Sequence, residues 1–481
     1  MFKQNLMQHQ RDGIDFLVNN GGVGAFYWDV GTGKTLGALA TYEKFRGQTP
    51  NLKLMVICPL SLIESAWGAE IKKHTRFSYR NLNQKQLGIS DGYNYPSTDI
   101  YILNFEYLIS KNKLDTLIRF LKCYKWMCVI DESSKLKNNT SKTTKTILKL
   151  KNLFVHRIVM SGTPAPNSEM EYWGQMTFLK DRIFHPNFYA FRNTYFDMRR
   201  GMEIIPGQVL SRLDIQELYK KGYKYYLRPE NQKRLAERIR PYCHLVKKSE
   251  CMDLPEQIDQ YRVFQLGEDQ KKIYKDMKEA AIAEIINESP DPDYIVAKIA
   301  LTKLIKLRQI ISGFAIDAQG ATLRMKTNPK LDELKDLLED IGDAQAIIWC
   351  NFKKEIEDVS QMVGDRACFM WGEVPVSERE QAVIDFRTGK KQFLVANPAS
   401  AGLGLTFVNA SIEIFYSMDF SYEKYEQARG RIHRYGQKNN CLYIHLMGED
   451  TIDGYILDVL KKKKTIDESV KDFISERNRT V

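Results

Sequence analysis

Short apolar runs alternate with segments of helical length in two separate parts of the chain, residues 24–165 and 330–447. Parallel strands that are buried on both faces have this continuous apolar character, and a helix connects each strand to the next. Each part therefore predicts one parallel sheet with helices on both faces. The expected strands of the first part are Ala25–Trp28, Leu54–Cys58, Ile100–Leu103, Trp126–Ile130 and Arg157–Met160. Those of the second part are Ala346–Cys350, Ala367–Met370, Phe393–Ala396, Ile412–Phe415 and Leu442–Leu446.

The length of 481 residues exceeds a usual single domain and suggests two or three domains. We expect an α/β protein of two tandem lobes, residues 1–240 and 241–481, each with an insertion. The first insertion, about 171–235, is rich in aromatic and basic residues, and the second, about 266–325, is strongly helical. Further helices are expected as an antiparallel pair, Lys271–Ile286 and Tyr294–Ile311, and in the tail from Thr451.

The net charge of +11 and the pI of about 9.0 favour a polyanionic partner, nucleic acid first and a membrane surface second. The sequence starts without the apolar segment of a signal peptide, and the longest apolar run, Leu54–Ile63, is too short to span a bilayer. Buried reduced thiols are favoured over a metal site at Cys243, His244 and Cys251. We expect a soluble protein in the cytoplasm of a bacterial cell or viral host, or in a eukaryotic nucleus.

Residues 29–35, Asp-Val-Gly-Thr-Gly-Lys-Thr, follow an expected strand and precede an expected helix, which is the context of a phosphate-binding P-loop. Glycines let backbone N–H groups turn toward phosphate oxygens, and the helix N-terminus favours the negative charge. Lys34 would reach the β- and γ-phosphates of ATP, and Thr35 would hold Mg²⁺. A glycine-rich turn that binds no nucleotide is the alternative. The candidate nucleotide-binding residues of this loop are Gly31, Thr32, Gly33, Lys34 and Thr35.

An acidic pair, Asp131 and Glu132, ends the expected strand Trp126–Ile130. Phosphoryl transfer to water needs one carboxylate to position Mg²⁺ and another to orient or deprotonate the water. We expect Asp131 in the first role and Glu132 in the second, with a solvated acidic turn as the alternative. The P-loop and the acidic pair both lie at carboxyl ends of strands in one sheet, where such sheets bind ligands.

Gln427, Arg431 and Arg434 are spaced so that one helix would carry all three on the same face. Two guanidinium groups on one face require an anion, and the γ-phosphate of ATP bound to the other lobe is the obvious candidate. We expect these three residues to be catalytic, because such an arginine contributes about 10³–10⁵ in rate where it has been measured. A basic surface helix is the alternative. Gly430 costs a helix roughly 1 kcal/mol relative to alanine, which suggests a close approach there.

The order of these motifs resembles superfamily 2 helicases, and specifically the Swi/Snf-type DNA translocases, over almost the whole chain. After the acidic pair, Ser133 and Ser134 stand where the family often has a small residue and a histidine. The matching segments of the first half are Leu6–Gln10, Asp29–Thr35, Ile57–Ile63, Leu103–Glu106, Asp131–Asn138 and Ser161–Pro164. Those of the second half are Trp349–Phe352, Ala401–Thr406 and Gln427–Gln437, and Leu307–Ile310 also recurs in family members.

The resemblance implies two RecA-like lobes of the P-loop NTPase type, with helical protrusions that fill the gap between Pro164 and Ile347. It implies ATP and Mg²⁺ as ligands, with Gln10 recognising adenine and Gly404 adding to the nucleotide site. DNA would be held by sequence-independent backbone contacts from loops that follow strands. The candidate DNA contacts are Pro59, Ser61, Asn104, Ser161, Thr163, Asn351 and Thr406. The aromatic residues of 183–226 could stack on unpaired bases, although packing within the insertion is favoured.

The combined interpretation is a DNA-dependent ATPase that moves along double-stranded DNA. We expect it to act as a monomer and without a membrane. It would remodel protein–DNA complexes, or branched or annealing DNA, in replication, repair or recombination. A true strand-separating helicase is the first alternative, and a nucleotide-regulated DNA-binding scaffold is the second. Protein partners cannot be inferred from the sequence.

Overall fold

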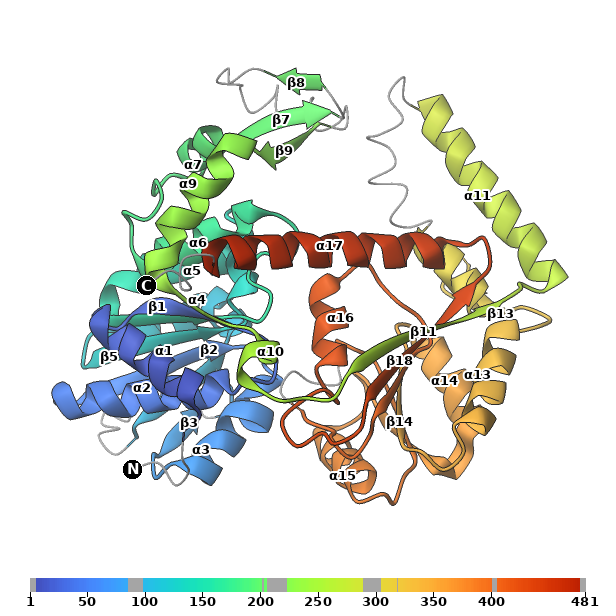
Figure 1. Cartoon of the computed structure of the whole chain (residues 1–481), viewed down its shortest axis with the longest axis horizontal. Helices are drawn as coiled ribbons and strands as arrows, with labels where there is room; N and C mark the ends of the chain where they lie inside the picture. The colour runs from blue at the N-terminus through green and yellow to red at the C-terminus, as the bar shows by residue number, and fades with distance from the viewer. Residues whose placement is uncertain are drawn as a thin grey trace.

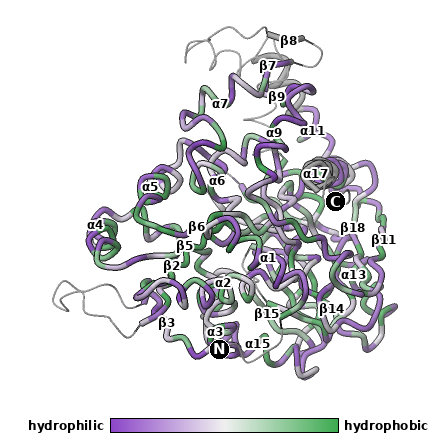
Figure 2. The backbone as a smooth tube through the Cα atoms, turned by 60° about the vertical axis from the view of Figure 1, so that its left-hand side comes forward, coloured by the Kyte–Doolittle hydropathy of each residue, from purple (hydrophilic) through white to green (hydrophobic). Residues whose placement is uncertain are grey.

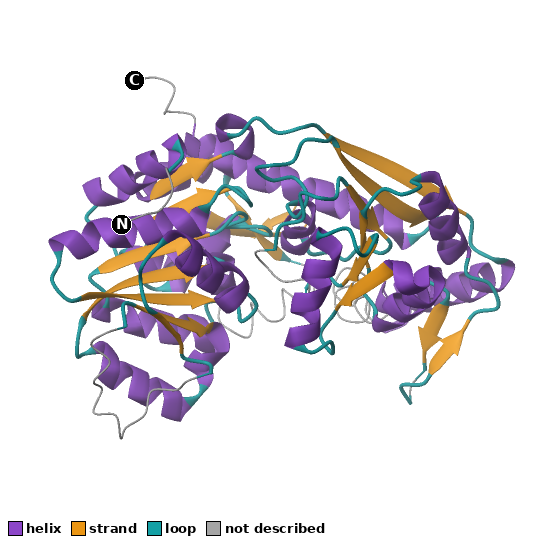
Figure 3. Ribbon diagram, turned by 90° about the horizontal axis from the view of Figure 1, so that it is seen from below, coloured by secondary structure: helices purple, strands orange, loops and turns teal. Residues whose placement is uncertain are grey.

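The computed structural model describes residues 6–84, 98–200, 203–205, 223–288, 304–317, 319–399 and 405–475. Two α/β lobes lie side by side, the first in blue to green and the second in yellow to red (Figure 1). Each lobe is built on one sheet whose paired strands are all parallel, with helices on both sides (Figure 3). The expected fold class, two tandem parallel-sheet lobes, is thereby confirmed.

The sheet of the first lobe has the strand order β10-β1-β6-β5-β2-β4-β3. All five expected strands are present, whereas β3 and β10 were not expected. Because β10 pairs with β1, the first lobe extends beyond the expected boundary at residue 240. The strands are β1 (Val23–Trp28), β2 (Leu52–Cys58), β3 (Tyr79–Asn81), β4 (Ile100–Asn104), β5 (Lys125–Asp131), β6 (His156–Met160) and β10 (Cys243–Val246).

Both faces of this sheet are buried, because successive side chains of a strand point to opposite faces. In β1, Phe26 and Trp28 join one hydrophobic cluster, and Ala25 and Tyr27 join the other. Figure 2 shows the hydrophobic colouring along the central strands. The first cluster is covered by α1 (Gln8–Asn19), α2 (Lys34–Gln48) and α3 (Ala69–His74). The second is covered by α4 (Lys111–Leu121), α5 (Lys142–Leu150), α6 (Tyr172–Leu179) and α9 (Pro229–Ile239).

The sheet of the second lobe has the order β11-β18-β17-β14-β16-β15 and contains all five expected strands. The additional strand β11 is exposed along most of its length, so it lacks the apolar run by which the others were recognised. The strands are β11 (Gln257–Phe264), β14 (Ala346–Trp349), β15 (Ala367–Met370), β16 (Phe393–Ala396), β17 (Ile412–Phe415) and β18 (Cys441–Gly448). The helices are α13 (Pro329–Asp340), α14 (Lys353–Val363), α15 (Val376–Arg387) and α16 (Tyr422–Arg429).

The insertion of the first lobe is not wholly helical, contrary to expectation. Its helices α7 (Phe188–Tyr195) and α9 flank an antiparallel sheet of β7 (Phe196–Arg200), β8 (Glu203–Ile205) and β9 (Lys224–Leu227). Phe184, Phe191 and Tyr195 are buried and pack on one another, so these rings stabilise the insertion. Residues 206–222 lie outside the described part of the chain.

The second insertion contains α11 (Glu268–Glu288), a helical stretch over 304–311 and the hairpin of β12 (Phe314–Ile316) and β13 (Thr322–Arg324). The rest of the expected second helix, 294–303, lies outside the described residues. The expected helical tail is α17 (Ile452–Ser475), which packs against β18 and α16 of the second lobe and against α9 of the first (Figure 1). Among the described residues, no helix combines the length and apolar character needed to cross a bilayer.

Candidate active site

The loop between β1 and α2 has the backbone that phosphate binding requires. Gly31 and Gly33 have φ angles of +92° and +81°, which glycine adopts most readily. The ammonium group of Lys34 donates hydrogen bonds to the carbonyl oxygens of Trp28 (2.8 Å) and Asp29 (3.1 Å), so it lies over the loop. Thr35 follows in the first turn of α2. The predicted P-loop residues are therefore gathered in one tight turn at a helix N-terminus.

Two side chains of α1 hold the same loop from another side. The amide group of Gln10 donates from Nε2 to the carbonyl oxygen of Gly33 at 3.2 Å. His9 Nε2 lies 2.8 Å from the carbonyl oxygen of buried Thr32. The structure thus brings Gln10, the candidate adenine-recognising residue, to the P-loop. The contact of His9 was not predicted, because a single histidine beside a glutamine forms no pattern of its own.

The acidic pair lies at the end of β5, and both carboxylates are buried. Asp131 accepts hydrogen bonds from the indole N–H of Trp67 (2.9 Å) and from the backbone N–H of Glu132 (3.1 Å). Glu132 has a φ of +55°, a strained value for a residue with a side chain, and such strain is concentrated at functional sites. Burial and the neighbouring Asp131 raise the pKa of Glu132 to about 8, while Lys34 and Arg431 oppose the rise.

These two carboxylates fit a divalent cation. Burial raises the pKa of Asp131 as well, so two adjacent acids lie in a region that disfavours their charge. One oxygen of Glu132, Oε2, is buried and has no hydrogen-bond partner among the described residues. A cation would compensate both charges, and oxygen ligands are those that Mg²⁺ prefers. The roles of Asp131 and Thr35 as Mg²⁺ ligands and of Glu132 in catalysis remain predictions.

The arginines of the second lobe lie on a turn, and the expectation that one helix carries them is wrong. Helix α16 ends at Arg429, and Gln427 is buried within it. The backbone N–H of Arg431 donates to the carbonyl oxygen of Ala428, three residues back, at 2.8 Å, and the carbonyl oxygen of Arg431 accepts from the backbone N–H of Phe407 at 2.9 Å. Residues 430–434, which we call the arginine turn, therefore leave the helical path.

The arginine turn lies directly against the P-loop. A Cβ atom added to Gly31 would stand 2.9 Å from Cγ of Arg434, and one added to Gly430 would stand 2.8 Å from Cγ1 of Val30. The close approach that Gly430 suggested in the sequence is thus present, and the approaching group is the P-loop. Arg434 also donates to Thr406 Oγ1 at 2.8 Å. A nucleotide bound at the P-loop would therefore contact both lobes.

Arg431 is 3 % exposed and donates to the carbonyl oxygen of Leu405 at 3.1 Å. Burial lowers its pKa to about 10, against the opposing effect of the carboxylates Glu413 and Glu132. Glu132 belongs to the first lobe, so an acid of the first lobe and a guanidinium group of the second are close enough to interact. The guanidinium group remains protonated at neutral pH and can act on a developing negative charge.

Lys248, which sequence reasoning missed, links the two parts of the site. Its backbone N–H donates to Oδ2 of Asp29 at 3.0 Å, and its ammonium group donates to the carbonyl oxygen of His433 at 2.9 Å. Burial, together with the charge of Arg434, lowers the pKa of Lys248 to about 8. The residue follows β10, which the sequence did not reveal as a strand, so nothing placed it beside the P-loop.

A second unexpected group, Gln175 of α6, joins the acidic motif to the segment after β6. It is completely buried, accepts a hydrogen bond from Ser133 Oγ at 2.6 Å and donates to the carbonyl oxygen of Pro164 at 2.7 Å. Tyr27 donates to the same amide oxygen at 3.0 Å. Ser133 therefore connects the acidic motif with the Ser161–Pro164 segment without a histidine.

The candidate DNA contacts differ in burial and in the hydrogen bonds that their side chains form. Ser61 is exposed and Pro59 is half-buried. Asn104, Ser161 and Thr163, at or just after the carboxyl ends of their strands, are buried. Asn104 accepts from the backbone N–H of Tyr107 at 3.0 Å and so caps the following turn. Asn351 donates to the carbonyl oxygen of Ser417 at 2.7 Å, and Thr406 bonds Arg434. Gly404 lies outside the described residues, and all these assignments remain predictions.

A P-loop lobe that faces an arginine-bearing lobe defines a two-lobed P-loop NTPase of the helicase type. Comparison with family models agrees with this class: the SNF2-related domain matches residues 9–313, and the helicase conserved C-terminal domain matches residues 329–436. The chain belongs to the SNF2-related family, as the sequence motifs predicted.

Relatives of this chain are long proteins. The TATA-binding protein-associated factor mot1 of Aspergillus fumigatus is 24% identical over 96% of this chain and 26% of its own length. An uncharacterized ATP-dependent helicase of Mycoplasma genitalium is 24% identical over 98% of this chain and 43% of its own length. The transcription regulatory protein SNF2 of Saccharomyces cerevisiae is 24% identical over 97% of this chain and 28% of its own length. The chain therefore spans less than half of each of these relatives.

Among solved structures, the Sulfolobus solfataricus SWI2/SNF2 ATPase core in complex with dsDNA is similar at 23% sequence identity and a TM-score of 0.42. The similarity covers 99% of this chain and 94% of that one.

Proposed function

We propose that this protein is an ATP-dependent motor that moves along double-stranded DNA. The observation that carries the proposal is the contact of Arg434 with Gly31, by which an arginine of the second lobe reaches the P-loop of the first. Because the arginines that complete the site come from the second lobe and its other groups from the first, hydrolysis requires the lobes to be closed. Alternate closing and opening then moves two DNA grips relative to each other.

Each residue of the site has a defined task in this cycle. Gly31, Gly33 and Lys34 bind the phosphates, and Thr35 and Asp131 hold Mg²⁺, which when bound neutralises phosphate charge. Glu132 orients the attacking water and accepts its proton. Arg431 and Arg434 stabilise the negative charge of the transition state from the second lobe.

Duplex DNA as the track is supported by the net charge of +11 and by family membership. One relative, from Schizosaccharomyces pombe, is a SWI/SNF chromatin-remodeling complex subunit. Remodelling of protein–DNA complexes, or of branched and annealing DNA, would follow from such movement. The candidate grips are the loops after β2, β4, β6 and β14, together with Thr406 before β17, so both lobes contribute.

The test is the ATPase rate with duplex, single-stranded, forked and four-way DNA and with RNA. We expect duplex DNA to stimulate most, and Lys34→Ala to abolish the rate. Lys44→Ala is the matched control, because Lys44 is exposed on the same helix α2. An unchanged rate in Lys34→Ala, or stimulation by RNA alone, contradicts the proposal.

Movement is measured separately by displacement of a triplex-forming strand from duplex DNA. A translocase displaces that strand without separating the duplex. Efficient separation of a forked duplex without triplex displacement would replace the proposal by a strand-separating helicase. Binding of DNA with no stimulated hydrolysis would replace it by a nucleotide-regulated scaffold.

A further inference from the structure

The chain passes from the first lobe to the second through a short linker that follows β10. Its helix α10 (Lys248–Cys251) lies between the two lobes, and the chain then continues into β11 of the second sheet (Figure 1). Lys248 is the first residue of this helix, and its backbone and its side chain bond different lobes. The linker therefore contacts both parts of the divided site.

The backbone of Lys248 is fixed to the P-loop. The last pair of residues between β10 and β1 is Val246 with Trp28, and the backbone N–H of Asp29 donates to the carbonyl oxygen of Val246 at 2.9 Å. One step further along the linker, the backbone N–H of Lys248 donates to Oδ2 of Asp29 at 3.0 Å. Asp29 is the first residue of the P-loop motif. We therefore expect the backbone of Lys248 to stay with the first lobe when the second lobe moves.

The side chain of Lys248 reaches the second lobe. Its ammonium group donates to the carbonyl oxygen of His433 at 2.9 Å. His433 lies in the arginine turn between Arg431 and Arg434. A displacement of this carbonyl group therefore changes the backbone that carries both arginines.

Every backbone carbonyl of the arginine turn accepts a hydrogen bond, and the bond from Lys248 differs from the others in its origin. The other donors are Arg434 Nε to Gly430 (2.6 Å), the N–H of Phe407 to Arg431 (2.9 Å), the N–H of Arg434 to Ile432 (3.0 Å) and the N–H of Gln437 to Arg434 (3.0 Å). All of these belong to the second lobe. The turn can therefore keep its own conformation without Lys248, while its hydrogen bond to the linker is lost.

The charged and ionisable groups around the ammonium group of Lys248 come from both lobes. They are Asp29 and Lys34 of the first lobe, Cys251 of α10, and Glu426, His433, Arg434 and Cys441 of the second lobe. Burial and the charge of Arg434 lower the pKa of Lys248 to about 8, whereas Asp29 and Glu426 oppose the change. Lys248 is therefore charged at neutral pH and loses its charge, and with it the stronger form of the hydrogen bond, as the pH rises through about 8.

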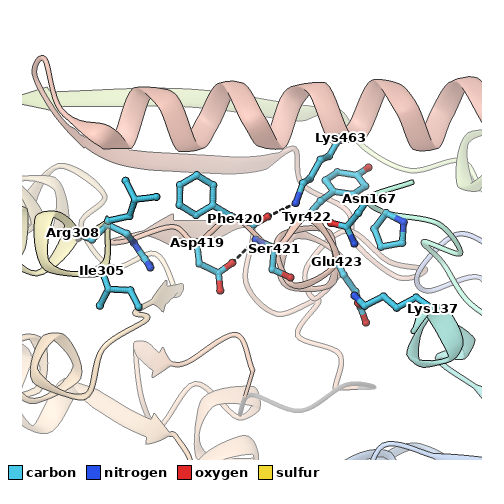
Figure 4. A pocket seen from close by; sticks show the side chains of 12 residues that line it. Lys137, Asn167, Ile305, Arg308, Asp419, Phe420, Ser421, Tyr422, Glu423 and Lys463 are labelled. Atoms are coloured by element: carbon cyan, nitrogen blue, oxygen red, sulfur yellow. Dashed lines mark hydrogen bonds between the residues drawn. The ribbon is translucent and has the colours of Figure 1, made fainter. Parts of the chain in front are cut away.

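Close packing does not hold the lobes together along their whole boundary. On another side of it, a cavity of about 400 Å³ is lined by Lys137 and Asn167 of the first lobe and by Asp419 and Phe420 of the second (Figure 4). Interfaces of this kind between domains allow relative movement. A single hydrogen bond beside the P-loop can therefore affect how the second lobe is placed.

We propose that Lys248 is a positioning residue of the ATPase reaction. Anchored beside the P-loop through Asp29, its ammonium group holds the carbonyl oxygen of His433 and so fixes the arginine turn against the first lobe. Lys248 acts through the two arginines and not on the phosphate groups. The inference rests on the proposed function, because it concerns how the same divided site closes.

The first test is steady-state ATPase kinetics of the full chain with duplex DNA. Lys248→Met keeps the aliphatic side chain and removes the donor. It should lower kcat about tenfold, the loss expected for one hydrogen bond from a charged group. The KM for ATP should stay within about twofold, because Lys34 still binds the phosphates.

Lys438→Met is the matched control, because Lys438 lies shortly after the arginine turn and is exposed. This variant removes one positive charge from the same lobe and should leave kcat within about twofold. An equal fall of kcat in Lys248→Met and Lys438→Met would mean that general charge is responsible, and would overturn the proposal.

Lys248→Arg separates a positioning role from a merely structural one and stays informative if Lys248→Met does not fold. The guanidinium group keeps a donor that stays charged at alkaline pH. The kcat/KM for ATP reports ionisations of the free enzyme, so in the wild type it should fall as the pH rises through about 8. In Lys248→Arg this fall should move to higher pH. A fall at the same pH in both proteins overturns the proposal.

Binding of ADP together with fluoroaluminate, a mimic of the transferring phosphoryl group, compares the transition state with the ground state. The arginine turn acts on charge that develops in the transition state, so Lys248→Met should bind this complex about tenfold more weakly. Its affinity for ADP alone should not change. Equal weakening for the two ligands would assign Lys248 to nucleotide binding in general and would contradict the positioning role.

Arg434→Ala separates failure of this inference from failure of the proposed function. Loss of ATPase activity in Arg434→Ala, with a normal kcat in Lys248→Met, rejects the positioning role and leaves the divided site. Hydrolysis that depends on Lys248, in a chain that no DNA stimulates, rejects the motor and supports the positioning role.

Discussion

Gly430 of the second lobe packs against Val30 of the P-loop so closely that a Cβ atom at Gly430 would stand 2.8 Å from Val30 Cγ1. The φ of Gly430 is −73°, which any residue adopts, so the requirement for glycine arises from space between the lobes. Closure of the lobes to this distance brings Arg434 onto Gly31. We therefore expect the size of the side chain at position 430 to limit how closely the lobes approach.

We predict that Gly430→Ala lowers kcat of the stimulated ATPase on the order of 10–100-fold with little change in the KM for ATP. The added methyl group separates the lobes and misplaces the arginine turn, while each lobe keeps its own core. The measurement is steady-state kinetics beside a urea unfolding curve. The double variant Gly430→Ala/Val30→Ala should recover activity relative to Gly430→Ala, because it restores the space. If it recovers none, the contact does not limit closure.

The second prediction concerns the link from Ser133 through Gln175 to Pro164. Ser133→Ala removes the 2.6 Å hydrogen bond while Tyr27 still satisfies the amide oxygen of Gln175. We expect the basal ATPase rate to persist and the stimulation by DNA to fall about two- to tenfold. This is the size of effect expected when one hydrogen bond that couples the DNA site to the ATP site is lost. Tyr27→Phe removes the other bond to the same oxygen and serves as control. If both variants lose stimulation equally, the Ser133 hydrogen bond has no special role in coupling, and the loss reflects packing around Gln175.

The central strands and the P-loop could be predicted because their signals are local. Val56 and Ile102 belong to continuous apolar runs, and Gly33-Lys34 lies between a strand and a helix in the sequence itself. The edge strand β11 escaped prediction because it pairs with β18 alone, so most of its side chains remain exposed and polar. The hydrophobic pattern of a sequence predicts a strand only where the side chains of that strand are buried.

The contacts between the lobes could not be predicted, because they depend on how distant segments pack. Lys248 reaches Asp29 across 219 positions of sequence. The helix expected to carry Arg431 and Arg434 ends at Arg429, and the carbonyl oxygen of Arg431 bonds the backbone N–H of Phe407 instead. Arg431 and Arg434 both lie on this turn, and their shared catalytic role remains a prediction. Nothing in the residues around Gln175 indicated its bond to Ser133.

The third prediction concerns Trp67, whose indole N–H donates to Asp131 Oδ2 at 2.9 Å. Trp67→Phe removes this donor while keeping an aromatic ring in the core. We expect the Mg²⁺ concentration for half-maximal ATPase to rise about tenfold or more, because groups that orient a metal ligand control its affinity. Trp126→Phe is the control, since Trp126 of β5 is equally buried and donates to the carbonyl oxygen of Leu121 instead. A Mg²⁺ dependence that shifts equally in both variants would assign Trp67 a packing role alone.

The fourth prediction is a pH dependence of stability that originates at Glu413 in β17. Its carboxylate is completely buried and accepts from the indole N–H of Trp349 at 3.0 Å. Burial raises its pKa to about 8, and Trp349, Arg429 and Arg431 only partly oppose this. The folded protein therefore holds a proton that the unfolded chain releases near its ordinary pKa of 4.5. The contribution to stability is complete below that value and is lost as the pH rises through about 8.

Glu413→Gln imitates the protonated acid and should remove this dependence. The free energies of unfolding of the variant and the wild type should be similar near pH 4.5. They should then diverge in favour of the variant as the pH rises, by an amount on the order of 4 kcal/mol above pH 8. Urea unfolding followed across this range measures the difference. Glu373→Gln is the control, because Glu373 is exposed and pairs with Lys353 at the surface. Parallel curves for Glu413→Gln and the wild type would mean that the buried carboxylate stays ionised, held so by the two arginines.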